Sequence, residues 1–453
     1  MFRFFSRYKP YYRNNLSIAL PVVFSQVGQV TVQITDNVMV GHYDATQLAA
    51  ASFANSIFIV GFVLSMGVTF GVTPLVGAAF GNNNFRKASS ILYHALILNT
   101  VFSVVLAAAM WVVSFYMNNM GQPDVVAQLA IPYYQILLVS LIPSAVFFTF
   151  KQFVEGLGNT KIAMVVTLLS NLVNIGLNYV FIYGKFGFPE LGLAGAGYAT
   201  LISRFFLAGS ILWLILKKPN FKRYFSIVNR KKVFRSQFSN VFKTGFPIGL
   251  QMLAEVTLFS LAAIMVGWVG ETELAAHQIA LSVSIVSFMI ATGNSSGTTI
   301  RVSHYLGAGR LVDMKRAGMA SFHLIVAFMG FCAVVFFFFR EYIPYLFVDS
   351  QNVHILSQAS RLLVFSAIFQ IFDGTQVVML GSLRGLSDVK RAFWLALVAY
   401  MLIGLPTAYF LGISMKFGVE GIWAGLSLSL AIAATLFFIR FWTIANQLIK
   451  NKQ

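Results

Sequence analysis

A long internal repeat is the feature that most constrains the fold of this 453-residue chain. When the sequence is shifted by 226 residues, Pro21–Gly81 aligns without a gap on Pro247–Gly307, and 20 of the 61 aligned positions are identical. Chance would give only about one identity in ten in a chain of this composition. The protein therefore contains two homologous halves, and the positions at which the copies differ are the informative ones.

Two acidic residues distinguish the copies. Glu255 of the second copy aligns with Gln29 of the first, and Asp36 of the first copy aligns with Ala262 of the second. Glutamate and glutamine have nearly the same shape, so Glu255 and Gln29 differ mainly in the ability to carry charge. Each half thus has a carboxylate that its counterpart lacks.

The composition places these carboxylates in a membrane. Hydrophobic residues make up 58% of the chain and charged residues only 10%. No soluble fold buries that proportion of apolar surface, so we expect an all-α polytopic membrane protein. The net charge of +18 comes from Lys and Arg in short breaks between apolar runs, which argues against nucleic acid as a partner. The single cysteine, Cys332, excludes disulfide scaffolds and thiolate metal sites.

Twelve apolar stretches have about the 20 residues needed to cross a bilayer. They are expected near 16–40, 48–78, 89–113, 128–153, 162–184 and 193–216, and again near 243–267, 274–299, 317–339, 358–383, 392–412 and 419–442. Because six is even, both halves enter the membrane in the same direction. We therefore expect two six-helix bundles related by a pseudo-two-fold axis along the membrane normal. The predicted parts are an amino-terminal lobe, a basic linker and a carboxy-terminal lobe, at 1–216, 217–240 and 241–453.

The distribution of Lys and Arg predicts the orientation of these bundles. Both termini, the linker and alternate loops hold most of the basic residues, so this side is expected to face the cytoplasm. The basic amino terminus leads into a long first span without a small-residue cleavage site, which indicates an uncleaved anchor. The linker either fixes this topology or binds acidic lipid headgroups.

Three acidic residues, Asp36, Glu255 and Asp373, fall well within apolar spans. An ionised carboxylate at the bilayer centre costs about 3 kcal/mol or more, so such groups face a cavity or a partner and are candidates for function. Glu255 and Asp373 are expected at similar depths in spans seven and ten. If they face a common cavity, they can bind Na⁺ or share a proton. The alternative is that both are hydrogen-bonded for packing alone.

A second candidate cation site lies in the first half. Asn174 and Asn178 share one face of span five, and they could supply carbonyl oxygens beside Asp36, with a hydroxyl from Thr200. Oxygen ligands of this kind suit a hard monovalent cation. Hydrogen bonding between helices is the competing interpretation of the asparagines.

Two prolines and one histidine have alternative interpretations. Pro21 and Pro247 occupy equivalent places in the first span of each half, where an interior proline bends a helix, as a moving hinge or as a static kink. His277 replaces Ala51 in the repeat and is either a structural residue or a proton relay. We find no ATP-binding motif, so transport would depend on an ion gradient, and no organic cofactor is expected.

These features together resemble one transporter family. The residues that carry the resemblance are Pro21, Asp36 with Met39-Val40-Gly41, the glycines between Gly67 and Gly81, Glu255, Leu274-Ala275-Ala276-His277-Gln278 and Asp373-Gly374-x-Gln376. In this order, within two sets of six spans, they are similar to the multidrug and toxic compound extrusion (MATE) family, in its bacterial NorM-type branch. The resemblance covers roughly residues 10–445.

The resemblance implies an antiporter of the bacterial inner membrane that exports organic cations against inward Na⁺ or H⁺ flow. By this resemblance, the second-half cation site contains Glu255, Asp373 and Gln278, and the first-half site contains Asp36 with the polar residues Asn174, Asn178 and Thr200. The protein would act as a monomer among membrane lipids. Phe369 stands where some relatives would have a tyrosine, which puts sodium coordination in doubt and leaves proton coupling open.

Two other functions are considered. A flippase for a lipid-linked saccharide, from the same superfamily, would need cationic groups for pyrophosphate, and Arg204 near the middle of span six is the residue that favours it. An intramembrane aspartyl enzyme would need paired Tyr-Asp and Gly-x-Gly-Asp motifs, whereas Asp373 follows Phe372 and its partner acid is a glutamate. The sequence therefore favours a transporter over an enzyme.

Overall fold

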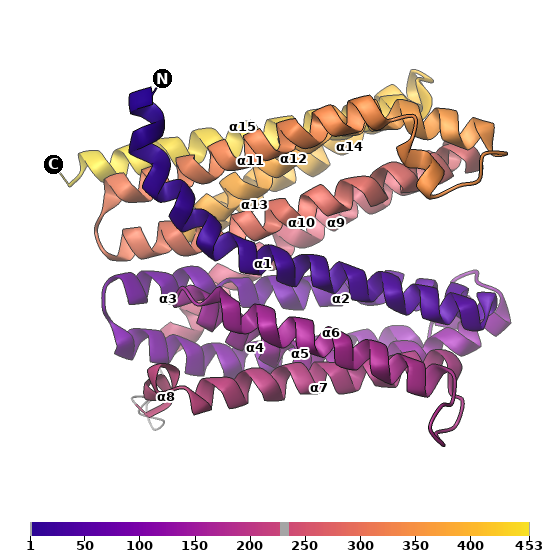
Figure 1. The fold of residues 1–453 in the computed structure, drawn as a ribbon, viewed down its shortest axis with the longest axis horizontal. Coiled ribbons are helices and arrows are strands. Elements are labelled where there is room, and N and C mark those ends of the chain that lie inside the picture. Colours follow the sequence, from indigo (N-terminus) through magenta and orange to yellow (C-terminus); the bar gives the residue numbers. More distant parts are fainter. Residues whose placement is uncertain (1, 227–234, 453) are drawn as a thin grey trace. The chain divides into compact units, whose positions relative to one another are not determined.

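The computed structural model of the protein describes residues 2–226 and 235–452, and these residues form helices and turns without any strand (Figure 1). Within this described part, twelve helices are long and apolar enough to cross a membrane. They coincide with the twelve stretches expected from the sequence, so the predicted all-α, twelve-span fold is confirmed. Arg230, Lys231 and Lys232, which belong to the predicted linker, lie outside the described residues.

The helices belong to two compact units. The first unit is Phe24–Gly249, and the second unit combines Met1–Val23 with Leu250–Gln453. The helices of the first half are α1 (Phe2–Tyr43), α2 (Ala45–Phe70), α3 (Val72–Gly81), α4 (Phe85–Ser114), η1 (Met117–Asn119), α5 (Asp124–Gly156), α6 (Thr160–Ile182), α7 (Gly192–Lys217) and α8 (Pro219–Ser226). Those of the second half are α9 (Arg235–Val269), α10 (Glu271–Gly307), α11 (Leu311–Phe339), η2 (Ile343–Leu346), α12 (Val353–Gly385), α13 (Val389–Leu397), η3 (Val398–Gly404), α14 (Leu405–Tyr409), η4 (Phe410–Ser414) and α15 (Gly418–Lys450).

Turns at equivalent places in the two halves have the same backbone conformation. Asn83 before α4 and Gly309 before α11 have φ values of 54° and 68°. Gly158 before α6 and Ser387 before α13 have φ values of 87° and 59°. A left-handed residue is uncommon outside glycine, so its recurrence at both places shows that the repeat extends from the sequence into the loop geometry.

The boundaries between the two units fall directly after the two prolines expected to bend their helices. Pro21 lies within α1 and Pro247 within α9, and the units divide after Val23 and after Gly249. The first turns of α1 consequently pack with the second six spans, and the first turns of α9 pack with the first six. The compact units therefore differ from the lobes expected from the sequence at two places. Residues 1–23 belong to the second unit, and residues 241–249 belong to the first.

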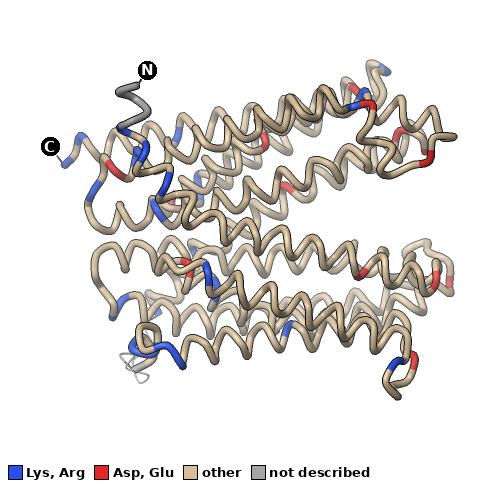
Figure 2. The backbone as a smooth tube through the Cα atoms, in the orientation of Figure 1, with Lys and Arg blue, Asp and Glu red and all other residues tan. Residues whose placement is uncertain are grey.

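Hydrogen bonds hold the beginning of α1 in the second unit. The Asn15 Nδ2 group donates to the Ala317 carbonyl at 2.9 Å and to Ser321 Oγ at 2.8 Å, both on α11. The Arg301 guanidinium of α10 donates to the Asn14 carbonyl at 3.1 Å. Figure 2 shows that both chain termini and most Lys and Arg positions of this unit lie at the same end.

Helix α8 begins the linker and packs against the first unit. Its side chains Phe221 and Tyr224 are buried, and the Ser89 hydroxyl of α4 donates to the Tyr224 carbonyl. The Arg223 guanidinium lies 4.4 Å from the centre of the Phe85 ring. The apolar face of this amphipathic helix is therefore occupied by protein.

Glycine allows a close approach between α9 and the junction of α2 and α3 within the first unit. A Cβ atom added to Gly71 would lie 2.6 Å from the backbone N and Cα atoms of Gly245. Backbone atoms cannot yield as a flexible side chain would, so any larger residue at position 71 must push the helices apart.

We predict that Gly71→Ala lowers the stability of the protein by about 1 to 3 kcal/mol because of this overpacking. Thermal unfolding in detergent measures the effect. Gly209→Ala on α7 is the matched control, since a Cβ atom there meets nothing within 4 Å. Equal melting temperatures for Gly71→Ala and the unaltered protein would contradict the tight packing described here.

Candidate functional site

The two carboxylates of the second half share one amide group. Glu255 lies on α9 and the buried Asp373 on α12. The Gln376 Nε2 group, one turn after Asp373, donates to Glu255 Oε1 at 2.9 Å and lies 3.4 Å from Asp373 Oδ1. The structure therefore brings Glu255 and Asp373 together, as expected from their matched depths.

A second glutamine supports Glu255 from its own helix. The Gln251 Nε2 group, one turn earlier on α9, donates to Glu255 Oε2 at 3.0 Å. The Gln251 Oε1 atom in turn accepts from the Arg384 guanidinium at 2.6 Å. Each oxygen of the Glu255 carboxylate thus receives an amide N–H group.

A phenol completes this carboxylate network. The hydroxyl of the fully buried Tyr400 donates to Gln376 Oε1 at 2.6 Å. Tyr400 lies in the π-helical segment η3, which precedes Pro406, a residue that cannot donate a backbone hydrogen bond. Widened turns of this kind are frequent at functional sites. We call Glu255, Asp373, Gln251, Gln376, Arg384 and Tyr400 the carboxylate network.

Sequence reasoning found both acids of the carboxylate network but not its other members. Gln251 and Gln376 lie four residues before Glu255 and three after Asp373, and this helical spacing was an available signal. Tyr400 gave no signal in the sequence, because a π-helical turn sets its direction. The expected member Gln278 is exposed on α10, and within the described part of the chain no hydrogen bond joins its side chain to either acid.

The candidate site of the first half is also partly assembled. The Asn178 Nδ2 group donates to Asp36 Oδ1 at 2.5 Å and to Asn174 Oδ1 at 3.2 Å. Both asparagines are buried, as expected for residues on one face of the helix. Thr200 is half-buried on α7, and the hydrogen bonds of the described residues do not connect it to Asp36. The structure thus brings together three of the four expected residues.

Arg204 places a positive charge near this cluster. The guanidinium lies 5.2 Å and 5.0 Å from the ring centres of Phe58 and Phe62, and it donates to Ser140 Oγ at 2.5 Å. It is also close enough to Asp36 for an electrostatic interaction. Arg204 is therefore engaged with the protein itself, which weakens it as a ligand for the pyrophosphate of a lipid carrier.

His277 is held as a neutral structural residue. The Trp423 indole N–H group donates to His277 Nδ1 at 3.0 Å, and the imidazole is fully buried. An indole is a donor only, so Nδ1 must accept and cannot carry a proton. The Phe369 ring packs on Trp423 with 5.4 Å between ring centres. This geometry favours the structural interpretation of His277 over the proton relay.

The two amides of the carboxylate network point their N–H groups at the acids. Sodium takes oxygen ligands, but both amide oxygens near Glu255 are engaged by Arg384 and Tyr400, and the amide N–H groups face the acids. The amides therefore donate to the acids in this structure and do not offer them oxygen ligands.

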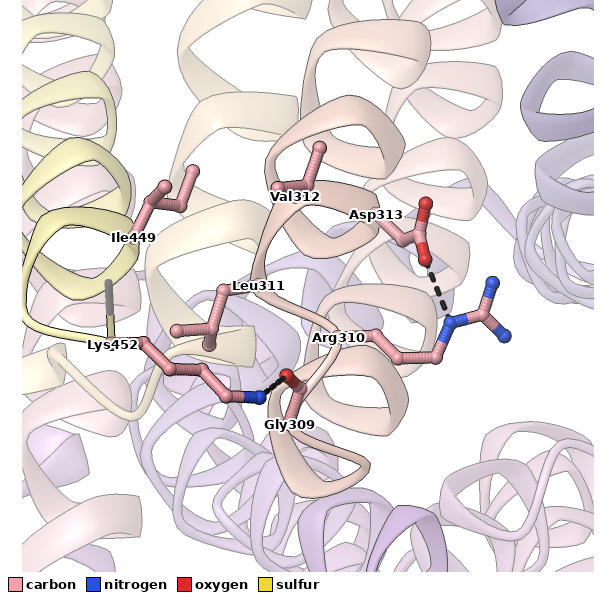
Figure 3. A pocket seen from close by; sticks show the side chains of 7 residues that line it. All are labelled: Gly309, Arg310, Leu311, Val312, Asp313, Ile449 and Lys452. Atoms are coloured by element: carbon pink, nitrogen blue, oxygen red, sulfur yellow. Dashed lines mark hydrogen bonds and ion pairs between the residues drawn. The ribbon is translucent and has the colours of Figure 1, made fainter.

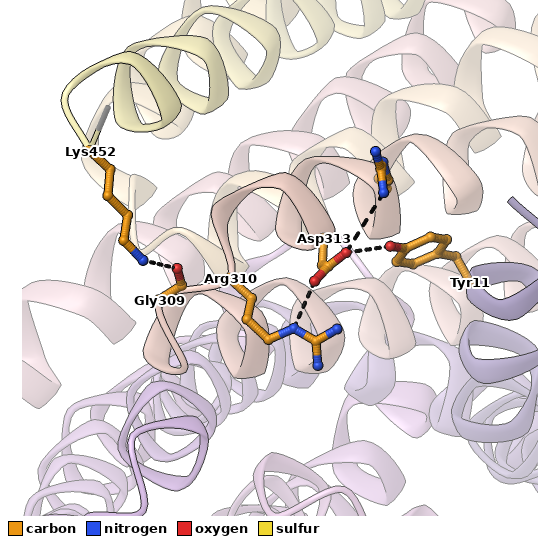
Figure 4. A network of polar contacts seen from close by, with 6 residues as sticks. Tyr11, Gly309, Arg310, Asp313 and Lys452 are labelled. Atoms are coloured by element: carbon orange, nitrogen blue, oxygen red, sulfur yellow. Dashed lines mark hydrogen bonds and ion pairs between the residues drawn. The ribbon is translucent and has the colours of Figure 1, made fainter. Parts of the chain in front are cut away.

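A small hollow of about 320 Å³ lies away from both acidic clusters. Figure 3 shows its lining, which joins the turn before α11 to the end of α15. Beside it, the Tyr11 hydroxyl donates to Asp313, which also pairs with Arg310 at 2.7 Å (Figure 4). These contacts add to the anchoring of α1 on α11, so we assign the hollow a structural role.

Sequence comparisons agree with this architecture. A family model described as MatE matches residues 21–180 and 247–410, one segment in each half. The probable multidrug resistance protein NorM of Rhizobium meliloti is 33% identical over 440 residues, which cover 96% of this chain and 94% of that protein. The multidrug resistance protein NorM of Vibrio cholerae is 32% identical over 449 residues, with 97% of both chains covered.

Solved structures share the fold at lower sequence identity. A structure described as MATE in the bent conformation superposes with a TM-score of 0.88 at 20% identity, covering 97% of both chains. The outward-facing conformation of a multidrug resistance MATE family transporter gives the same TM-score, identity and coverage. At this identity the likeness shows the fold alone.

Substitution of two buried glutamines by leucine should have opposite effects on the stability of the protein. Gln251→Leu should lower stability by about 2 to 3 kcal/mol, because it removes the hydrogen bonds that Gln251 makes with Glu255 and with Arg384. Gln370→Leu should be neutral or stabilising, since both polar atoms of this buried side chain are without a partner among the described residues. Thermal unfolding in detergent compares them, and equal losses of stability would contradict the network.

Proposed function

The chain belongs to the MatE family, and from this premise we propose that it is a secondary active multidrug antiporter that exports organic cations in exchange for an inward-moving cation. Its relatives are named as multidrug resistance proteins and match nearly the whole chain. The protein is a transporter and not an enzyme, and it crosses the bacterial inner membrane twelve times. The substrates are small molecules, and we assign the positively charged ones to the acidic clusters.

The observation that carries this proposal is the position of the carboxylate network. Two acids on different spans, Glu255 and Asp373, share the Gln376 amide within apolar helices. A negative charge in that setting favours a positive partner, which is either the coupling cation or the cationic drug. Antiport follows if the two cations compete and the protein alternates between two states.

The first unit would serve the same exchange from the other half of the molecule. Asp36 is held by Asn178 in a cluster that includes Asn174. We assign Asp36 to cation recognition and the prolines at positions 21 and 247 to bending of α1 and α9 during transport. Aromatic side chains, with 46 Phe and 17 Tyr in the chain, offer surfaces for flat cationic molecules.

The orientation follows from the basic residues. Both termini and most Lys and Arg positions of the second unit lie at one end (Figure 2). We assign this end to the cytoplasm by the positive-inside rule. The protein would work as a monomer among membrane lipids, and no organic cofactor takes part in the exchange.

We predict that Glu255→Gln strongly lowers gradient-driven drug uptake by everted membrane vesicles, because the amide keeps the shape of the side chain but lacks the negative charge that attracts a cation. Coupling free energies of about 1 to 3 kcal/mol correspond to losses of about 5- to 150-fold. Dye accumulation is the measurement, with Glu341→Gln at a side chain that is 72% exposed as the control. Intact accumulation in Glu255→Gln would show that the assigned role is wrong.

A lipid-linked saccharide flippase is the second candidate. Arg204 is the residue that favoured it, and its contacts with Phe58, Phe62 and Ser140 leave it as an internal charge. Binding of a lipid pyrophosphate and of ethidium to the purified protein separates the two functions. We expect ethidium to bind and the pyrophosphate not to bind.

A further inference from the structure

We propose that α11 and α15 together bind one anionic phospholipid at the end of the second unit that we assign to the cytoplasm. The lipid site consists of Lys315 and Phe322 of α11 and of Phe438, Trp442 and Asn446 of α15. Lys315 binds the phosphate, and the aromatic rings support an acyl chain. This inference goes beyond the proposed function and does not depend on it, since no residue of the lipid site belongs to the acidic clusters.

Neutral groups hold the Lys315 side chain. Its Nζ atom lies 3.4 Å from the centre of the Trp442 ring and donates to Asn446 Oδ1 at 2.7 Å. The ion pairs of the described residues do not include Lys315, and the nearby Asp313 is paired with Arg310 at 2.7 Å. No acid within the described part of the chain therefore offsets the charge of this ammonium group.

Two further hydrogen-bond donors lie beside Lys315. Lysine is a donor only, so the Asn446 atom that faces it must be the amide oxygen. The NH₂ group of Asn446 and the indole N–H group of Trp442 make no hydrogen bond to the described residues, and both side chains are exposed. The lipid site thus offers an ammonium group and two N–H donors, which are the groups that bind a phosphate.

An aromatic ladder continues from Trp442 into the span. The Phe438 ring, one turn earlier on α15, is stacked on the indole with 6.0 Å between ring centres. The Phe322 ring of α11 follows, with its centre 5.1 Å from that of Phe438. Phe322 lies seven residues after Lys315, which is about 10 Å deeper at 1.5 Å per residue. Half-buried rings from two helices therefore form an apolar surface below the ammonium group.

The position of the lipid site selects an anionic lipid. Lys315 lies in the second turn of α11 and Asn446 near the end of α15, and both termini and most Lys and Arg positions of this unit lie at one end (Figure 2). An exposed tryptophan at the end of a span lies at the level of the lipid headgroups. A zwitterionic headgroup would also bring an amine, for which the lipid site has no carboxylate. An anionic headgroup matches both the charge and the depth.

The first unit has a lysine on a tryptophan but not the rest of the lipid site. Lys217 Nζ lies 4.7 Å from the centre of the Trp213 ring, and both residues are exposed on α7. The two residues are one turn apart on a single helix. Among the described residues no ring of a second span packs on Trp213. Lys217 is therefore the matched control for Lys315.

The test measures quenching of Trp442 fluorescence by phospholipids with brominated acyl chains, added to the purified full chain in detergent. The quenching that Trp442→Phe removes reports the lipid site. We expect brominated phosphatidylglycerol to quench saturably and at lower concentration than brominated phosphatidylcholine. Equal quenching by the two lipids would overturn the proposal. Relief of the quenching by soluble glycerol 3-phosphate would also overturn it, because the site would then take free phosphates.

Variants test the role of Lys315. Lys315→Gln should weaken quenching by phosphatidylglycerol about fivefold, the effect of one lysine near an anionic membrane surface, and should leave phosphatidylcholine unchanged. Lys315→Arg keeps the charge and should keep the preference, and so should Lys217→Gln. An unchanged preference in Lys315→Gln, or an equal loss in Lys217→Gln, would contradict the assignment. If Lys315→Gln does not fold, the comparison of the two lipids on the unaltered protein still decides.

Discussion

Two carboxylates within apolar helices share one amide nitrogen, and the function proposed for this protein depends on that contact. Glu255 and Asp373 lie on α9 and α12, and Gln376 links them. Burying an acid in such a place is unfavourable unless its oxygens are satisfied. In the described residues the hydrogen-bonding partners of the two acids are amide N–H donors, and the Arg384 guanidinium binds one of these amides, Gln251. With both acids ionised, the network would carry two negative charges against one positive charge.

Glu255 lies on a helix, α9, whose first turns pack with the other unit. The first turns of α1 pack in the second unit and the first turns of α9 pack in the first, with the change directly after Pro21 and after Pro247. Glu255 lies two turns beyond the proline of α9, in the part of the helix that packs with α12. Any bending at Pro247 would change how the first turns of α9 are oriented relative to Glu255. The repeated prolines thus lie where a structural change could be coupled to occupancy of the acids.

The sequence was sufficient for the fold and for the acids, but not for their partners. Span length and the repeat are local properties of the chain, so the twelve helices and the candidates Glu255, Asp373 and Asp36 could be read directly. Which side chains meet these acids depends on the rotation of each helix. Gln278 and Gln376 belong to equally prominent motifs, and only the packed helices show that Gln376 faces the acids while Gln278 is exposed. The direction of the Tyr400 side chain depends on the π-helical segment η3, and no periodic pattern of residues predicts such a segment from the sequence.

The central claim is that a cationic drug and the coupling cation compete for the same negative charge, and the dependence of drug binding on that cation tests it most directly. Ethidium binding to the purified protein in detergent solution is measured over a range of pH values and, separately, of sodium concentrations. The account predicts that protons or sodium ions weaken binding to the unaltered protein and that Glu255→Gln loses most of this effect. Tight binding of ethidium by the unaltered protein that changes with neither pH nor sodium would contradict it.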